Sequence, residues 1–264
     1  MRIGIFDSGV GGLSVLRELR RELPGAALHY VADSGHAPYG ERSDAYVLDR
    51  SQRVASHLIH CGAEIVVIAC NTATAVAARS LRESWPQTPI VGVEPGIKPA
   101  LAATRNGRVG VMATRGTLNS DKFRELVAVL APHKPLHLRA CDGLAAAIEE
   151  GFPDAPGLLS LVAHHARPLR DAGIDTVVLG CTHYAFARQQ IQAAFGPAVH
   201  VIDTAVAVAR HSAHTARETP RGIGMGVEQQ APVMLLQTTG SAAHLARIAS
   251  AWLGERVTAS HIAA

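Results

Sequence analysis

Aromatic residues are scarce in this sequence, since Phe, Tyr and Trp together make up only 4% of its 264 residues. Charged residues are also few, at 18%, whereas hydrophobic residues reach 48%. A disordered chain would show the reverse balance, so the composition excludes extensive disorder. A core of small aliphatic side chains is typical of parallel strands buried between helices. We therefore predict an α/β fold.

Long hydrophobic runs and clusters of basic residues are also missing. No apolar run approaches the roughly 18–20 residues that a membrane-spanning helix requires, and the N-terminus reads as a strand rather than a signal peptide. The formal charge is only +3, and the basic residues are scattered without interleaved aromatic residues. We therefore expect a cytoplasmic protein that binds neither membranes nor nucleic acid.

Cysteine is limited to four residues, and no two of them form a CxxC pair: Cys61, Cys70, Cys141 and Cys181. Isolated cysteines in a chain without a signal peptide are typical of reduced thiols. We therefore expect neither disulfides nor a thiolate metal site.

Two halves of the chain repeat the same order of apolar segments. The segments 2–6, 28–30, 62–70 and 91–94 return as 108–112, 136–138, 173–181 and 201–203. Four matches in one order at a nearly constant offset indicate two homologous α/β lobes with parallel sheets. Amphipathic segments of helical length lie between these strands, at residues 43–61, 72–84, 118–130 and 158–172.

The end of the chain is predicted to complete the first lobe. Residues 233–238 read as a strand and residues 242–253 as a helix, whereas the polar segment 218–232 reads as a surface loop. The second lobe is then an insertion into the first. This assignment gives a first lobe of residues 1–94 and 205–264 and a second lobe of residues 95–204.

Both copies of the repeat place a cysteine where the third strand ends, Cys70 in the first lobe and Cys181 in the second. Ligands of open parallel sheets collect at this edge, where helix N-termini supply unpaired N–H groups. Because a helix N-terminus lowers the pKa of a neighbouring thiol, we expect both cysteines to act as acid/base groups. Buried cysteines often only fill space, and we favour that role for Cys61 and Cys141.

A glycine-rich segment follows the first predicted strand, between Asp7 and Leu13. It lacks the third glycine of a GxGxxG motif and the Lys–Ser/Thr of a phosphate loop. The glycines either ease a tight turn or bind a phosphate, and Asp7 suggests a carboxylate that pairs with an ammonium group. In the second lobe, His183 follows Cys181 closely enough to orient or protonate that thiol.

Five segments carry a resemblance that covers nearly the whole chain: IGIFDSGVGGLSVL at 3–16, APYGERS at 37–43, ACNTATA at 69–75, GVEPGIKPA at 92–100 and LGCTHY at 179–184. In these segments the sequence resembles the cofactor-independent aspartate/glutamate racemase superfamily. The resemblance implies two pseudo-symmetric flavodoxin-like lobes with the active site in the cleft between them. It implies that neither a cofactor nor a metal takes part.

The resemblance also implies roles for individual residues. It makes Cys70 and Cys181 the two bases, one on each face of the substrate α-carbon, and gives assisting roles to Asp7, His183 and Glu149. It matches the following residues to substrate-binding positions: Asp7, Ser8, Tyr39, Gly40, Asn71, Thr72, Thr114, Thr117, Thr182 and His183.

The sequence departs from the family pattern at two places. Residues 141–144 replace the usual Cys-Pro start of the helix that carries the assisting carboxylate, so Glu150 remains an alternative to Glu149. The chain also begins at its first strand, without the N-terminal extension of family members that need a cell-wall precursor as activator. We therefore expect activity without such an activator.

The implied activity is an isomerisation that interconverts L- and D-glutamate and supplies D-glutamate for peptidoglycan synthesis. The expected partners are glutamate and a second copy of the chain in a homodimer. Three alternatives stay open: racemisation of aspartate or a hydantoin by the same two thiols, hydrolysis by a Cys181–His183 pair, and amino-acid binding without catalysis.

Overall fold

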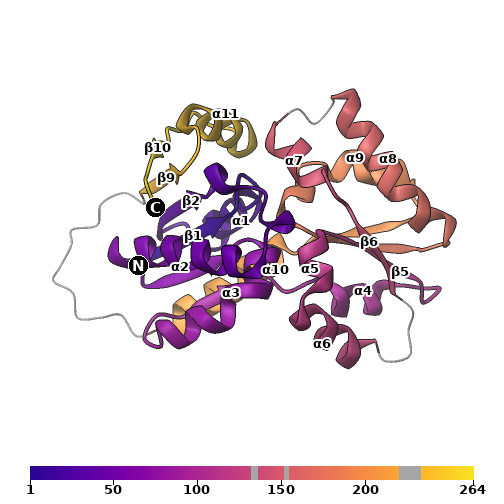
Figure 1. Ribbon diagram of the computed structural model, residues 1–264, viewed down its shortest axis with the longest axis horizontal. Coiled ribbons are helices and arrows are strands. Elements are labelled where there is room, and N and C mark those ends of the chain that lie inside the picture. The colour runs from indigo at the N-terminus through magenta and orange to yellow at the C-terminus, as the bar shows by residue number, and fades with distance from the viewer. Residues whose placement is uncertain (132–135, 152–154, 220–232) are drawn as a thin grey trace.

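The computed structural model describes residues 1–131, 136–151, 155–219 and 233–264. Two parallel β-sheets lie side by side, each surrounded by helices (Figure 1). Sheet A contains β1 (Arg2–Asp7), β2 (Ala27–Ala32), β3 (Ile65–Ile68), β4 (Ile90–Gly92), β9 (Met234–Thr238) and β10 (Ser260–His261). Sheet B contains β5 (Val109–Ala113), β6 (Leu136–Ala140), β7 (Thr176–Gly180) and β8 (His200–Ile202).

The two sheets share one strand order, which confirms the predicted repeat. Sheet B runs β6-β5-β7-β8, and the equivalent part of sheet A runs β2-β1-β3-β4. Sheet A continues beyond β2 with β9 and β10, so the C-terminal strand does complete the first lobe. We call sheet A with its helices the first lobe and sheet B with its helices the second lobe. The strand membership supports the division at residues 95 and 204, which stays a proposal.

Helices α2, α3, α8 and α11 confirm predicted segments, and the described helices as a whole are α1 (Leu13–Glu22), α2 (Asp44–His60), α3 (Asn71–Ser84), α4 (Ile97–Ala103), α5 (Arg115–Asn119), α6 (Asp121–Leu130), α7 (Leu144–Glu149), α8 (Pro156–Asp171), α9 (Arg188–Phe195), α10 (Ala205–Glu218) and α11 (Ala242–Leu253). Three short 3₁₀ helices accompany them: η1 (Ser34–His36), η2 (Tyr39–Glu41) and η3 (Thr182–Ala185).

The predicted helix over 118–130 is interrupted, because the Ser120 hydroxyl accepts a hydrogen bond from the backbone N of Phe123 at 3.2 Å and caps α6 separately from α5. Of the predicted loop over 218–232, Glu218 belongs to α10, and residues 220–232 lie outside the described residues.

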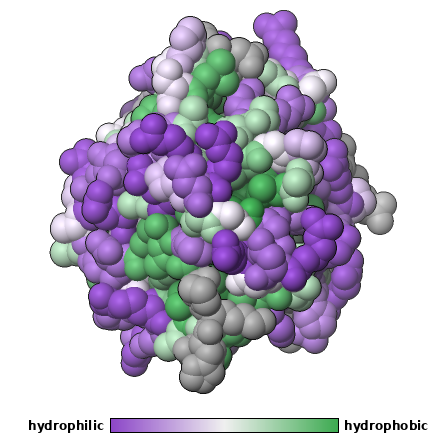
Figure 2. Space-filling model, turned by 90° about the vertical axis from the view of Figure 1, so that its right-hand side faces the viewer, coloured by the Kyte–Doolittle hydropathy of each residue, from purple (hydrophilic) through white to green (hydrophobic). Residues whose placement is uncertain are grey.

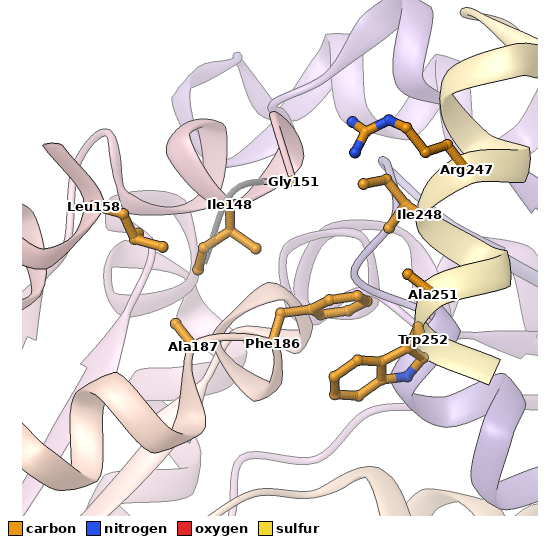
Figure 3. A pocket seen from close by; sticks show the side chains of 9 residues that line it. All are labelled: Ile148, Gly151, Leu158, Phe186, Ala187, Arg247, Ile248, Ala251 and Trp252. Atoms are coloured by element: carbon orange, nitrogen blue, oxygen red, sulfur yellow. The ribbon is translucent and has the colours of Figure 1, made fainter. Parts of the chain in front are cut away.

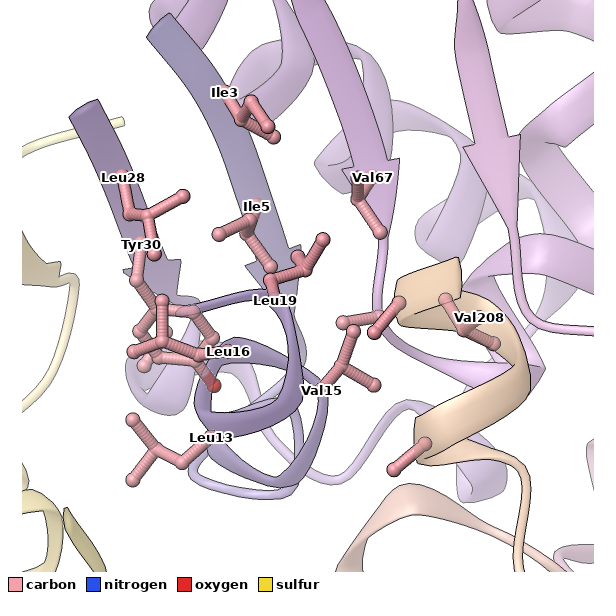
Figure 4. Close-up of a cluster of buried hydrophobic side chains, with 14 of the residues drawn as sticks. Ile3, Ile5, Leu13, Val15, Leu16, Leu19, Leu28, Tyr30, Val67 and Val208 are labelled. Carbon is pink, nitrogen blue, oxygen red and sulfur yellow. The ribbon is translucent and has the colours of Figure 1, made fainter. Parts of the chain in front are cut away.

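Each sheet is covered by helices on both faces, because successive side chains of a strand point to opposite faces. In β1, Ile3 and Ile5 belong to the core formed with α1 and α10 (Figure 4), whereas Phe6 packs with α2 and α3. In β5, Val111 packs with α4 and α6, and Met112 packs with α7, α8 and α9. Burial on both faces explains why the central strands β3, β5 and β7 are almost continuously apolar.

The surface of the second lobe mixes hydrophilic residues with smaller hydrophobic areas (Figure 2). Among the described residues of this lobe, three large hydrophobic side chains are exposed, Val129 on α6, Leu138 on β6 and Leu159 on α8. None of the described helices is both long enough and apolar enough to cross a membrane.

Candidate active site

A cavity of about 300 Å³ lies between the two lobes, at the carboxyl ends of their strands. This volume is at the lower end of the range of about 300–1,000 Å³ that is usual for small-molecule sites. The cavity brings together ten of the predicted site residues: Ser8, Tyr39, Gly40, Cys70, Asn71, Thr72, Thr114, Glu149, Cys181 and His183. The other three, Asp7, Thr117 and Thr182, are buried behind its wall.

On the first-lobe side, Cys70 caps the N-terminus of α3. Its Sγ accepts a hydrogen bond from the backbone N of Ala73 at 3.4 Å and donates to Oγ of Ser8 at 3.8 Å. The helix N-terminus does not lower the pKa of this thiol as we expected. Burial raises the pKa of Cys70 to about 12, and the negative charge of Asp7 adds to the effect. Desolvation therefore outweighs the helix N-terminus at this position.

Asp7 lies behind Ser8 and is fully buried. Its Oδ1 accepts hydrogen bonds from the backbone N of Gly9 at 2.7 Å and from Oγ of Ser8 at 3.3 Å, and its Oδ2 accepts one from Oγ1 of Thr182 at 2.8 Å. Burial raises the pKa of Asp7 to about 6, against the opposing positive charge of His183. Since both oxygens are occupied and the cavity does not reach them, this placement does not support the predicted pairing with an ammonium group.

On the second-lobe side, Cys181 lies beside an imidazole ring. Its Sγ is 3.9 Å from Nδ1 of His183, and Nε2 of His183 is 2.7 Å from Oε2 of Glu149. Burial alone would lower the pKa of His183, but hydrogen bonds with Cys181 and Glu149 and the charge of Asp7 raise it well above its usual value. The helix that we predicted after Cys181 is only the short η3, and α9 begins later in the chain.

Glu149, rather than Glu150, is the carboxylate joined to His183. Its Oε2 also accepts a hydrogen bond from the backbone N of Val10 at 2.8 Å, and its Oε1 accepts one from Oγ of Ser34 at 2.8 Å. Burial alone would raise the pKa of Glu149, but these bonds and the one from His183 lower it below its usual value. A carboxylate of the second lobe is thus held by two groups of the first.

Three threonines form a second junction between the lobes. Oγ1 of Thr72, on α3, is 3.0 Å from Oγ1 of Thr114, which in turn is 2.9 Å from Oγ1 of Thr117. Beside them, Gly40 approaches Thr114 so closely that a Cβ atom on the glycine would lie 2.6 Å from the Cβ of Thr114. Tyr39 completes this wall and donates its hydroxyl hydrogen to Asp33.

Asn71 is the clearest sign of a ligand in this cavity. Its side chain lines the cavity beside Cys70 and is only 4% exposed, yet neither Oδ1 nor Nδ2 has a hydrogen-bond partner among the residues that the structure describes. A buried amide without partners costs free energy, so an occupant that satisfies both atoms is expected. Oδ1 can accept from an ammonium group, and Nδ2 can donate to a carboxylate.

The glycine-rich segment after β1 is explained by close contact with the second lobe. A Cβ atom on Gly9 would lie 2.3 Å from Oε2 of Glu149, and one on Gly11 would lie 2.3 Å from Nδ1 of His183. The glycines therefore let the acid/base side chains of the second lobe reach the backbone of the first, which neither the turn nor the phosphate interpretation had anticipated.

Ser34 on η1 also lines the cavity, as its place at the end of the second strand predicts. One polar residue of the cavity was missed in the sequence, His244 on α11, because it belongs to no motif and only the packing of distant segments brings it to the site. Cys61 and Cys141 lie outside the cavity lining, as we expected. In the part of the chain that the structure describes, no group of three His, Cys, Asp or Glu side chains is placed to hold a metal ion.

Comparison with known proteins places this geometry in context. The family model for Asp/Glu/hydantoin racemases matches residues 3–212. A glutamate racemase from Ectopseudomonas mendocina is 51% identical over 208 residues, which cover 79% of this chain and 79% of the relative. A glutamate racemase from Ralstonia pickettii is 44% identical and covers 98% of this chain and 90% of the relative.

Solved structures agree with these relatives. Glutamate racemase isoform RacE1 from Bacillus anthracis superposes with a TM-score of 0.87 at 31% identity, covering 99% of this chain and 97% of that one. Escherichia coli glutamate racemase in complex with L-glutamate and the activator UDP-MurNAc-Ala gives a TM-score of 0.88 at 29% identity, covering 99% and 98%. Both similarities extend over both lobes.

Proposed function

Since the chain belongs to the Asp/Glu/hydantoin racemase family, we propose that it interconverts L- and D-glutamate by moving a proton at the α-carbon between two thiols. The observation that carries this proposal is the cavity itself, in which Cys70 and Cys181 come from equivalent strand ends of opposite lobes. A Cys181–His183 hydrolase would leave Cys70 without a role, and a binding protein would need neither thiol.

In the proposed reaction, one sulfur removes the α-proton while the other donates a proton to the opposite face. Because burial raises the pKa of Cys70 to about 12, this thiol rests protonated and is the donor in one direction. Cys181, beside the imidazolium of His183, is then the base. The electron pair left on the α-carbon takes the proton of Cys70, and the reverse reaction exchanges the two roles.

The electron pair at the α-carbon needs stabilisation, because a free amino acid offers no extended electron sink. Preorganised donors in a site with little water can provide it. The first N–H groups of α3 have no partner within the helix and, together with the amide of Asn71, can bind the α-carboxylate. Closure of the two lobes would then exclude water from the reacting atoms.

The direct test is an assay of the purified protein with L-glutamate and with L-aspartate. We expect D-glutamate to form, with a kcat/KM at least about 10-fold above that for aspartate, because one methylene group in a fitted pocket is worth about 1–3 kcal/mol. Activity should persist in a chelator and after removal of pyridoxal phosphate. Formation of D-aspartate as the preferred product, or dependence on an added cofactor, would overturn the proposal.

We further propose that the protein works in the cytoplasm, where its product, D-glutamate, is used for peptidoglycan synthesis. We also propose that the protein is a homodimer. The first point is supported by the glutamate racemase relatives. The exposed Val129, Leu138 and Leu159 offer apolar surface for the second. Rescue of a bacterial strain that requires D-glutamate tests the cellular role. Light scattering of the purified protein tests the dimer.

A further inference from the structure

The C-terminal end of α7 is joined to the first lobe by side chains of α11. Nε2 of His244 donates a hydrogen bond to the backbone oxygen of Glu149 at 2.7 Å, and the guanidinium of Arg247 donates to that of Glu150 at 3.2 Å. The last carbonyl groups of a helix have no partner within that helix. Helix α11 thus supplies the hydrogen-bond donors that α7 cannot supply itself.

His244 holds the backbone of Glu149, whose carboxylate contacts His183 beside Cys181. The carboxylate of Glu149 contacts His183, Val10 and Ser34, while its carbonyl oxygen contacts His244. Glu149 is therefore attached to the first lobe through both its backbone and its side chain. A shift of its backbone would move the carboxylate away from the imidazole that lies beside Cys181.

An apolar cavity separates part of α7 from α11. The cavity has a volume of about 250 Å³. Figure 3 shows Ile148 of α7 and Ile248 of α11 on its facing walls. Phe186 and Trp252 stack at one end, with ring centroids 4.1 Å apart. The hydrogen bonds from α11 therefore act together with an apolar contact at this end of α7, where a Cβ atom on Gly151 would lie 2.1 Å from Cδ1 of Ile248.

The imidazole of His244 has no nitrogen to spare for a substrate. Its Nε2 faces the carbonyl oxygen of Glu149, which can only accept, and its Nδ1 lies 3.3 Å from the guanidinium of Arg247, which can only donate. Although His244 lines the active-site cavity, both ring nitrogens are thus used within the protein. Its contribution is to position another residue rather than to bind.

We propose, on the basis of the proposed racemase function, that His244 is a positioning residue that holds Glu149 against His183 and thereby prepares Cys181 for proton transfer. An interaction with only a structural role would stabilise the fold and leave the kinetic constants unchanged. A positioning role predicts that the reaction at Cys181 slows when the hydrogen bond is lost.

The test compares three variants. His244→Ala removes the donor, His244→Gln places an amide N–H near the position of Nε2, and His244→Asn reaches only as far as Nδ1. His214→Ala is the matched control, because His214 lies exposed on α10 and pairs only with Glu218 in the contacts described. The kinetic constants in both directions, the α-deuterium isotope effect and the melting temperature are measured for each.

We expect His244→Ala and His244→Asn to lower kcat/KM by about 10- to 100-fold, and His244→Gln to stay within about 3-fold of the unaltered protein, because small displacements of catalytic groups have effects of this size. The isotope effect on kcat should rise for the enantiomer that Cys181 deprotonates. The Cys70→Ala variant identifies this enantiomer, because Cys181 is the thiol that remains in it.

A lower melting temperature with unchanged kinetic constants would overturn the positioning role, and so would equal losses in the folded Gln and Asn variants. If the Ala variant does not fold, the contrast between Gln and Asn decides alone. Absence of racemisation in the unaltered protein would instead overturn the proposed function, and this inference with it.

Discussion

The two lobes share one strand order but surround their cysteines with different groups. Cys70 caps a long helix and contacts a hydroxyl group and a backbone N–H. Cys181 precedes a short 3₁₀ helix and contacts the imidazole of His183. The repeat therefore places two thiols at equivalent positions, whereas the groups that assist them are not repeated.

The assisting groups also cross between the lobes. Asp7 of the first lobe accepts a hydrogen bond from Thr182 of the second, and Glu149 of the second accepts hydrogen bonds from Val10 and Ser34 of the first. Neither half of the site is complete within its own lobe. Small changes at the junction should therefore reach both thiols.

The largest expected effect follows removal of either thiol. Cys70→Ala and Cys181→Ala should each lower racemisation of glutamate by about 1,000-fold or more, because each removes one of the two acid/base groups. Each variant should still eliminate chloride from only one enantiomer of β-chloroglutamate, since elimination needs only one base. Normal racemisation by Cys70→Ala would show that the two thiols are not a pair.

The next largest effect tests whether Asp7 assists Cys70 and His183 assists Cys181. Asp7→Asn and His183→Asn should each cost about 1–4 kcal/mol in kcat, the usual range for loss of a preorganised donor or acid/base helper. Because the enantiomers have equal energy, kcat/KM must stay equal in both directions, so any asymmetry appears as kcat and KM changing together. Full kinetic constants in both directions measure it, and unchanged values would assign both residues to packing.

A third effect concerns the pH dependence of stability. Burial raises the pKa of Asp7 from 3.8 to about 6 in the folded state, so its stabilising contribution is present below pH 4 and is lost as the pH rises through about 6. At about 1.4 kcal/mol per pKa unit, the loss amounts to about 3 kcal/mol. Between pH 4 and pH 7.5, the free energy of unfolding of the unaltered protein should therefore fall by this amount relative to that of Asp7→Asn.

Urea unfolding at the two pH values measures this shift. His183→Asn serves as the comparison, because it alters the charge next to Asp7 and leaves the buried carboxyl group in place. Identical pH dependence in Asp7→Asn and the unaltered protein would show that Asp7 does not titrate in this range.

The smallest effect tests the contact between the glycine-rich segment and the second lobe. Gly11→Ala should lower kcat/KM by about 10- to 100-fold, because its Cβ would displace the ring of His183 and such shifts are costly to catalysis. Gly25→Ala is the matched control, since a Cβ at Gly25 would meet no atom within 4 Å. Equal activity of both variants would argue against a tight junction.

The sequence predicted the elements of the site that depend on local order. The repeat identified Cys70 and Cys181 correctly as strand-end residues of two lobes, because buried strands have a recognisable apolar pattern. The C-terminal strand and helix were also predicted, and β9 joins the sheet of the first lobe.

The sequence could not predict what depends on contacts between distant segments. It gave no sign that His244 would meet Glu149, and it could not reveal that burial would raise the pKa of Cys70. The register between Glu149 and Glu150 was also open until the contact with His183 was seen. Each of these depends on how the lobes pack, and local patterns do not encode that packing.

The central claim is that two thiols act on opposite faces of one α-carbon. Racemisation of L-glutamate in heavy water, followed by optical rotation and by α-deuterium content, tests it most directly. At early times the D-glutamate formed should carry deuterium, because the thiol that donates to the product has exchanged its proton with solvent. The remaining L-glutamate should keep its hydrogen, because the thiol that faces it holds the hydrogen that it has removed. Deuterium entering both enantiomers at the same early rate, or product that retains the original hydrogen, would contradict the account.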